Sequence, residues 1–316
     1  MGAEVVKTIT VLLACYQGEK HLPEQLASLA AQDDTAFRVL MQDDGSEDGT
    51  MQLLRDIAAQ DSRFILAAHH GRHFGAKGNF WSLLAQADTP YVAFCDQDDI
   101  WQPDRLSACR AAIEQAEREC GEDTPILVHS DCTLIDGQGN VLHESFFAHQ
   151  GWDPAATTLP RLLVQNNVTG CTALFNRALC RAALETGDPQ KMFMHDWFMA
   201  LLAASTGRVV FVAKPLVRYR QHGKNVMGAS RSGLIARGVK ALGAYKRGQE
   251  RIALTYRHAS DFRTACGSLL PDEACTLIDR YLATKHMTKI KRVLTVRRLG
   301  CTMQSTVTRI GQIIFG

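Results

Sequence analysis

The chain has 316 residues, of which 46% are hydrophobic and 22% are charged. This composition is typical of a globular protein and excludes a largely disordered or low-complexity chain. No uninterrupted apolar run approaches the roughly 20 residues that a membrane-spanning helix needs, so we expect no membrane span. The ten cysteines include no CxxC pair, so we expect free thiols of a reducing compartment rather than a disulfide framework.

Charge is divided unevenly along the chain, although the formal net charge is only +2. Residues 1–199 hold 14 Lys/Arg and 28 Asp/Glu, whereas residues 200–316 hold 21 Lys/Arg and five Asp/Glu. Residues 285–316 carry seven Lys/Arg and no acid, with isoleucine, valine and leucine between the basic residues. Such an asymmetry predicts a basic surface that meets an anionic partner, either a membrane or a nucleic acid.

The first half of the chain alternates between short apolar, β-rich runs and segments with apolar residues at helical spacing. The predicted strands cover residues 5–14, 37–41, 64–67, 91–95 and 126–129. The predicted helices cover residues 22–31, the segment from Asp48 to residue 59, residues 80–87 and about 103–119. This alternation predicts a parallel α/β sheet with helices on both faces.

The second half is less regular. We expect strands at residues 166–175 and 209–212 and a helix at 195–205. From residue 233 onward apolar residues recur at helical spacing within a strongly basic segment. This pattern predicts a basic helical extension after an α/β domain.

Polar and acidic residues follow three of the predicted strands. Tyr16 comes after the first strand, Asp43 and Asp44 after the second, and Asp96 and Asp98 after the fourth. Ligands of parallel α/β sheets collect at the carboxyl edge of the strands, and two carboxylates at this spacing can share a divalent cation with the phosphates it holds. The alternative is that these acids only form turns and cap the helices that follow.

Four stretches together resemble a known family. They are residues 9–16, residues 43–50 (DDGSEDGT), residues 96–101 (DQDDIW) with Pro103, and residues 195–197 (HDW). Their order and separation over about residues 7–225 resemble glycosyltransferase family 2, in particular the bacterial rhamnosyltransferase-like enzymes of O-antigen and capsule assembly.

The resemblance implies a GT-A fold, which is a Rossmann-like, mostly parallel sheet with helices on both faces. It also implies an inverting transfer by direct displacement. The catalytic domain would cover residues 1–228, with a nucleotide-binding part at about 1–100 and an acceptor part at about 101–228. The basic helical extension would then cover residues 229–316.

The resemblance also implies roles for individual donor-site residues. Tyr16 and Asp44 would contact the nucleotide base. Asp96 would contact the ribose and the metal region, and Asp98 would hold Mn²⁺ or Mg²⁺. Lys77 lies where relatives often carry a basic donor-binding residue.

For the acceptor side, the resemblance implies that Asp196 is the general base that takes the proton of the acceptor hydroxyl. The alternative is a carboxylate favoured only by the helix N-terminus. His195 and Trp197 would shape the acceptor site, and Trp197 could stack on a sugar face. His222 would complete the metal site or touch the diphosphate, although lone histidines are usually structural.

Gly170 belongs to residues 168–171, a stretch that resembles the lining of the donor-sugar and acceptor pocket. The favoured donor is dTDP-rhamnose, and a UDP-hexose or UDP-HexNAc donor is the alternative. The acceptor would be a glycan or a lipid-linked glycan in cell-surface polysaccharide synthesis. More distant alternatives are a sugar nucleotidyltransferase and a nucleic-acid-binding protein, for which no recognised binding motif is present.

The basic C-terminal segment, with its interspersed apolar residues, predicts attachment to an anionic membrane surface, with no nucleic acid bound. The protein would then be peripheral at the cytoplasmic face of the membrane. The alternative is that this segment packs on the catalytic domain.

Overall fold

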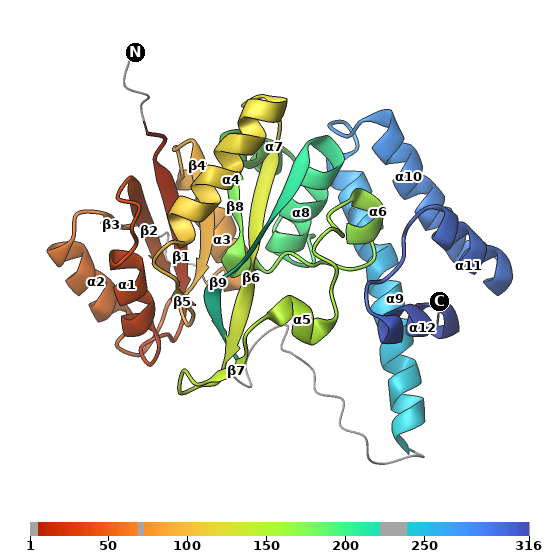
Figure 1. Cartoon of the computed structure of the whole chain (residues 1–316), viewed down its shortest axis with the longest axis horizontal. Coiled ribbons are helices and arrows are strands. Elements are labelled where there is room, and N and C mark those ends of the chain that lie inside the picture. The colour runs from red at the N-terminus through yellow and green to blue at the C-terminus, as the bar shows by residue number, and fades with distance from the viewer. Residues whose placement is uncertain (1–5, 69–72, 222–238, 316) are drawn as a thin grey trace.

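The computed structural model describes residues 6–68, 73–221 and 239–315 (Figure 1). One sheet runs through the molecule in the order β3-β2-β1-β4-β8-β6-β9-β5, and β7 pairs with β6 at its side. The strands are β1 (Ile9–Cys15), β2 (Phe37–Asp43), β3 (Phe64–Leu66), β4 (Tyr91–Asp96), β5 (Ile100–Trp101), β6 (Ile126–Ile135), β7 (Val141–His143), β8 (Leu174–Asn176) and β9 (Arg208–Arg220).

Strands β1, β2 and β4, which carry predicted site residues at their ends, are parallel to one another, and β3 adds a further parallel strand beside β2. Strand β8 lies antiparallel to both β4 and β6, and β9 runs parallel to β6. The predicted mostly parallel α/β sheet is therefore confirmed.

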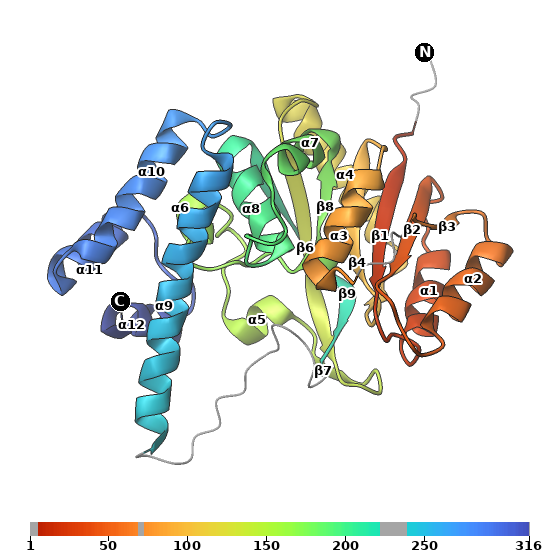
Figure 2. The ribbon, with the colours of Figure 1, turned by 180° about the vertical axis from the view of Figure 1, so that it is seen from behind.

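The helices are α1 (Leu22–Ala30), α2 (Thr50–Gln60), α3 (Gly75–Gln86), α4 (Arg105–Cys120), α5 (Phe146–Gln150), α6 (Leu159–Leu162), α7 (Arg177–Thr186), α8 (His195–Thr206), α9 (Val239–Cys266), α10 (Asp272–Ala283), α11 (Lys289–Arg298) and α12 (Thr306–Phe315). Short 3-10 helices occur at Gly170–Thr172 and Thr284–His286. Helices α1, α2 and α4 cover one face of the sheet and pack into one apolar cluster. Helices α3, α7 and α8 cover the other face, as seen from behind in Figure 2, and pack into the second cluster.

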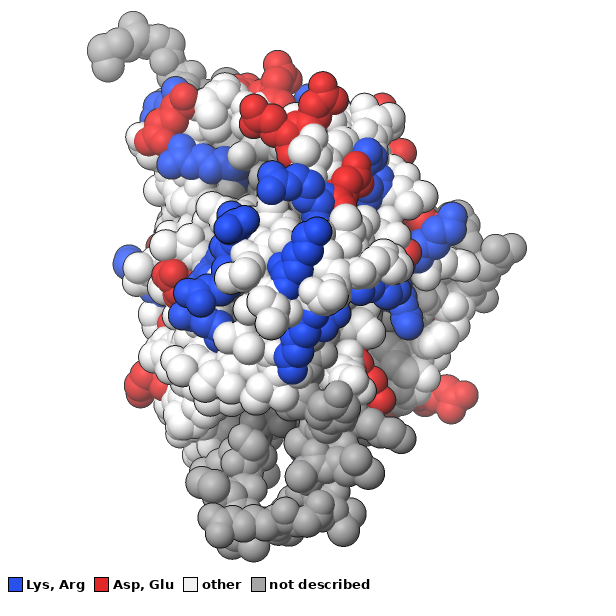
Figure 3. Space-filling model, turned by 90° about the vertical axis from the view of Figure 1, so that its right-hand side faces the viewer, with Lys and Arg blue, Asp and Glu red and all other residues white. Residues whose placement is uncertain are grey.

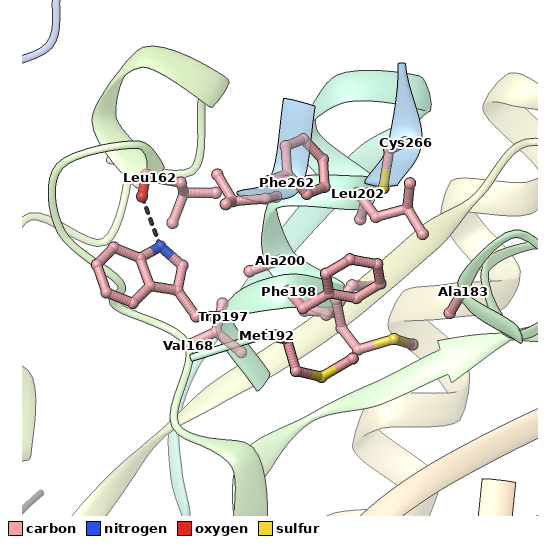
Figure 4. Packing of buried hydrophobic residues seen from close by; sticks show 14 of the residues in the cluster. Leu162, Val168, Ala183, Met192, Trp197, Phe198, Ala200, Leu202, Phe262 and Cys266 are labelled. Atoms are coloured by element: carbon pink, nitrogen blue, oxygen red, sulfur yellow. Dashed lines mark hydrogen bonds between the residues drawn. The ribbon is translucent and has the colours of Figure 1, made fainter. Parts of the chain in front are cut away.

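The C-terminal helices extend the second cluster outward from α8. Phe262 of α9 packs edge-on against Phe198 of α8 with ring centroids 5.7 Å apart. Figure 4 shows these two rings, with Leu202 and Cys266, in the seam between the helices. Helix α9 is thus anchored on the sheet domain through buried apolar contacts.

One predicted strand is wrong. Of residues 166–175, only the last two lie in β8, which starts at Leu174, and a 3-10 turn precedes it. The Asn166 side chain accepts the backbone N–H of Val168 and donates to the Val168 carbonyl, at 3.0 and 2.8 Å. Asparagine therefore offers this backbone local partners that compete with a strand ladder.

Two findings bear on the expectations from composition. All ten cysteines are free thiols. Among the residues that the structure describes, no helix is both long enough and apolar enough to span a bilayer.

Candidate active site

The ends of β1, β2 and β4 meet at one edge of the sheet because the three strands run in parallel register. Cys15 lies opposite Asp43, and Ala14 lies opposite Asp96. The side chain of Gln97 ties the loops together, since it accepts the N–H of Tyr16 and donates to its carbonyl, both at 2.8 Å. The residues predicted at three strand ends thus lie at a common edge.

Asp96 lies at the centre of a group of carboxylates. Burial, followed by the charges of Asp98 and Asp196, raises the pKa of Asp96 to about 7. Asp99 is fully buried, and burial together with the Asp98 and Asp96 charges raises its pKa well above the ordinary value. Four acids from two distant segments of the chain therefore repel one another in one place.

This donor set fits a divalent metal ion. Carboxylate oxygens are the ligands that Mg²⁺ and Mn²⁺ prefer, and a cation would relieve the repulsion that raises the pKa of Asp96. Ligand atoms of Asp96, Asp99 and Cys171 lie within 4.8 Å of one another. Burial and these two acids raise the pKa of the Cys171 thiol, so it stays protonated and is a poor ligand for a hard cation.

Arg220, to which we assigned no role of its own from the sequence, holds the acidic loop in place. Its buried backbone N–H donates to Asp99 at 3.0 Å, and its guanidinium donates to the carbonyl of Asp98 at 2.8 Å. The same guanidinium forms an ion pair with Glu24 of α1. Asp99 thus fastens the end of β9 to the end of β4.

Asp196 lies in the first turn of α8 and faces this group. Burial raises the pKa of Asp196 to about 6. Hydrogen bonds from Trp197, Gly170 and Asn166 act in the opposite direction and lower this pKa. The backbone N–H of Trp197 donates to Asp196 Oδ1 at 2.7 Å. The structure therefore brings the predicted base and the predicted metal-binding acids together.

Gly170 and His195 pack beside Asp196. A Cβ atom on Gly170 would lie 3.3 Å from His195 Nε2 and 3.4 Å from Asp196 Cβ. His195 is buried, with its ring stacked on Phe80 at 4.4 Å and edge-on to Phe94 at 4.8 Å. Burial, with a smaller contribution from the Lys77 charge, lowers the pKa of His195 to about 3, so the ring is neutral. His195 is thus a buried, neutral side chain next to Asp196.

The expectation that Trp197 stacks on a sugar is wrong. Trp197 is only 6% exposed, and its indole N–H donates to the Leu162 carbonyl at 2.7 Å (Figure 4). The ring packs against His258 of α9, with centroids 4.4 Å apart. The indole ring thus packs between α8, α6 and α9, and neither face of the ring is accessible to a sugar.

The predicted base-contacting residues lie around the tip of β2. Tyr16 is 48% exposed, and its ring lies 4.9 Å from that of His73. Asp44 is buried, and its two carboxylate oxygens accept the N–H groups of Phe74 and Gly75, each at 2.7 Å. Asp44 therefore fixes the start of α3, and its contact with a base stays a prediction.

Lys77 and His222 complete the predicted set. Helix α3 begins earlier than expected, which places Lys77 in its first turn. The Lys77 ammonium donates to the Met192 carbonyl at 2.7 Å, in the loop before α8. Its role toward a donor stays a prediction. His222 lies outside the described residues.

Relatives of known name match much of the chain. The dTDP-rhamnosyl transferase RfbG of Shigella flexneri is 25% identical over 226 residues, which are 69% of this chain and 74% of that protein. The putative glycosyltransferase EpsH of Bacillus subtilis is 25% identical over 219 residues, 68% of this chain and 61% of that protein. The chain therefore matches less than two thirds of the length of EpsH.

Solved structures share the fold. S. aureus TarS 1-349 in complex with UDP-GlcNAc has a TM-score of 0.58 at 17% identity, over 98% of this chain and 89% of that chain. The mannosyltransferase PcManGT from Pyrobaculum calidifontis, with GDP-Man and Mn²⁺, has a TM-score of 0.54 at 16% identity, over 93% and 73%. The fold is accordingly that of GT-A glycosyltransferases. The family "Glycosyl transferase family 2" matches residues 10–180, more than half of the chain, so this protein belongs to that family and is a glycosyltransferase that uses a nucleotide sugar.

Proposed function

We propose that this glycosyltransferase transfers rhamnose from dTDP-rhamnose, with inversion and with a divalent metal ion, to a glycan or lipid-linked glycan acceptor in cell-surface polysaccharide synthesis. The observation that carries the proposal is the meeting of Asp96, Asp98 and Asp196 at one edge of the sheet. The similarity to a dTDP-rhamnosyl transferase over 69% of the chain favours this donor. A UDP-HexNAc donor is the second candidate, because the fold also resembles a structure that holds UDP-GlcNAc.

Asp98 and Asp96 are the residues that would hold Mn²⁺ or Mg²⁺. When bound, the ion supplies positive charge that neutralises the diphosphate leaving group. The repulsion that raises the pKa of Asp96 to about 7 supports this assignment, since a cation between the carboxylates would remove it. We keep His222 as a third candidate ligand.

Asp196 is the proposed general base. Its pKa of about 6 leaves the carboxylate ionised at neutral pH, yet basic enough to take a proton from an acceptor hydroxyl. The Trp197 N–H limits rotation of the carboxylate, and the absence of a side chain at Gly170 leaves its flank open. Tyr16, Asp44 and Lys77 stay the proposed donor-binding residues.

The C-terminal helices are the proposed membrane-facing surface. Figure 3 faces these helices and shows Lys and Arg side chains across the middle of this face, with residues other than Lys, Arg, Asp and Glu (white) between them. Val307, Ile310 and Ile314 of α12 are exposed, the first by 80%. Cations and exposed aliphatic side chains together suit an anionic leaflet at the cytoplasmic face of the membrane, where a lipid-linked acceptor would lie.

A donor panel tests the proposal. Purified protein would be given dTDP-rhamnose, UDP-GlcNAc, UDP-glucose or GDP-mannose with a lipid-linked glycan fraction, and release of the nucleoside diphosphate would be measured. We expect release from dTDP-rhamnose that needs Mn²⁺ or Mg²⁺ and stops with chelator. If only UDP-GlcNAc releases its nucleoside diphosphate, UDP-GlcNAc is the donor and the assignment of dTDP-rhamnose is wrong. Full activity in excess chelator would overturn the metal dependence.

A further inference from the structure

A cavity of about 350 Å³ lies among the C-terminal helices, far along the chain from the acidic site. Helices α9, α11 and α12 supply most of its wall. Two of its aromatic residues, Tyr256 and Tyr281, are stacked with centroids 4.8 Å apart. Their hydroxyls bond to Thr284 and Thr255 inside the protein, so the rings present apolar surface. The volume is within the range of small-molecule sites, roughly 300–1,000 Å³.

Four arginines line this cavity, namely Arg161, Arg292, Arg297 and Arg309, and no acid lines it. Within the described part of the chain, Arg161, Arg297 and Arg309 take part in no ion pair. Arg161 donates to the hydroxyl of Thr302, and Arg309 donates to two backbone carbonyls, all neutral acceptors. Because arginine does not lose its proton at physiological pH, the wall keeps its positive charge.

Bonds between uncharged groups also link the walls of the cavity. Gln312 of α12 donates to the Cys301 carbonyl at 2.8 Å and accepts the N–H of Met303 at 3.0 Å. Val296 and Leu299 on the neighbouring helix are buried in the core cluster. A ligand would therefore enter a preformed site.

Exposed aliphatic side chains lie on the helices that form the cavity. Ile313 both lines the cavity and is 41% exposed, and Ile310 and Ile314 are exposed on the same helix. Leu294 on α11 is exposed as well. A ligand that satisfies the whole surface must carry an anionic group for the arginines and an apolar part for the isoleucines.

We propose that this cavity binds the phosphate head of an anionic membrane lipid, with the acyl chains lying along the exposed isoleucines of α12. Guanidinium groups bind phosphate oxygens through paired hydrogen bonds. A nucleic acid would also supply phosphate, but it would leave the aliphatic rim exposed to water. The inference deepens the membrane attachment proposed above and rests on it. It differs from general surface attraction because it assigns one site with defined residues.

The test compares two charge-matched double variants. Arg297→Gln/Arg309→Gln removes two cations from the cavity wall. Lys291→Gln/Arg298→Gln removes two exposed cations of α11 that do not line the cavity. Binding of dihexanoyl phosphatidic acid, kept below its micelle concentration, is measured by calorimetry at low salt without donor or metal. We expect the cavity pair to weaken binding at least tenfold and the α11 pair to change it less than twofold.

The same comparison and two further measurements decide the result. If both double variants weaken lipid binding equally, charge alone attracts the lipid and the proposed cavity site is wrong. If inorganic phosphate competes with the lipid at equal concentration, the ligand of the cavity is a free anion and the lipid assignment is wrong. The single variant Arg297→Gln, whose side chain is exposed, guards against misfolding of the double variant and should weaken binding at least threefold.

Vesicles separate this inference from the proposed attachment. If wild-type protein ignores phosphatidylglycerol vesicles at low salt, membrane attachment itself is wrong. If it binds those vesicles but not the soluble phosphatidic acid, attachment stands and the cavity site is wrong. If the protein binds phosphatidylcholine vesicles as strongly as phosphatidylglycerol vesicles, binding does not require an anionic head group.

Discussion

The strand-end site and the C-terminal helices concentrate charge of opposite sign. At the strand ends, Asp96, Asp98, Asp99 and Asp196 converge, and the pKa of Asp96 rises to about 7 because its carboxylate is partly desolvated and its neighbours are negative. Around the C-terminal cavity, arginines converge beside apolar surface. Carboxylates relieve their repulsion by binding protons, whereas arginines keep their charge. We therefore expect the acidic site to respond to pH and to divalent metal, and the basic cavity to respond to anions and salt.

The largest effect is expected from removing a carboxylate that the metal needs. Asp98→Ala should lower turnover by about 10³-fold or more, because several kcal/mol of charge stabilisation at the leaving group would be lost. The melting temperature should hardly change. Diphosphate release with and without chelator measures this, and Asp104→Asn, an acid on the neighbouring helix start, is the matched control. Retained activity in Asp98→Ala would remove Asp98 from the metal site.

The next effect concerns the base. Asp196→Asn keeps the shape of the side chain but removes the proton acceptor, so kcat should fall by about 10²–10⁴ while donor affinity survives. Steady-state kinetics would show this, with the exposed Glu185→Gln of α7 as control. A change confined to KM would mean that Asp196 only binds the acceptor.

A smaller effect is expected from pH. Because the pKa of Asp196 is about 6, kcat should fall about tenfold per pH unit below 6 and level off above 7. The pH profile with saturating donor and metal measures this. A profile that is flat between pH 5 and 7 would show that no group with this pKa carries the proton.

The smallest effect is on stability. The folded-state pKa of Asp96 is about 7, against an ordinary value of 3.8. Between these pH values the native protein binds more protons than the unfolded chain, so stability falls as the pH rises through 7. In chelator at pH 8, Asp96→Asn should therefore gain about 1–2 kcal/mol, given 1.36 kcal/mol per pKa unit and a discount for partial exposure.

At pH 4 the wild-type and Asp96→Asn proteins should unfold alike, because Asp96 is then protonated in the native protein. Mn²⁺ should raise the melting temperature of the wild type and much less that of the variant. Thermal unfolding monitored by circular dichroism gives both results. A variant that is less stable than the wild type at pH 8 would contradict the like-charge account of this site.

The sequence by itself determined most elements of the first half of the chain and the residue types at the strand ends. Apolar runs at residues 5–14 and 91–95 predict strands because a short apolar run rich in β-branched and aromatic residues is a local property of the sequence. Acids directly after such strands fall at the same edge of any parallel sheet. The placement of Asp196 beside Asp96 came from the family resemblance, since nothing local joins segments 100 residues apart.

Only the tertiary structure decided which aromatic and basic residues are free to act. Trp197 is buried because α9 returns to pack on α8, and that contact depends on residues more than 60 positions away. Arg220 reaches Asp98 through the pairing of β9 with β6. The arginine cavity exists because α6, α9, α11 and α12 bring their side chains to one place. Long-range packing sets these contacts, and no local pattern in the sequence encodes them.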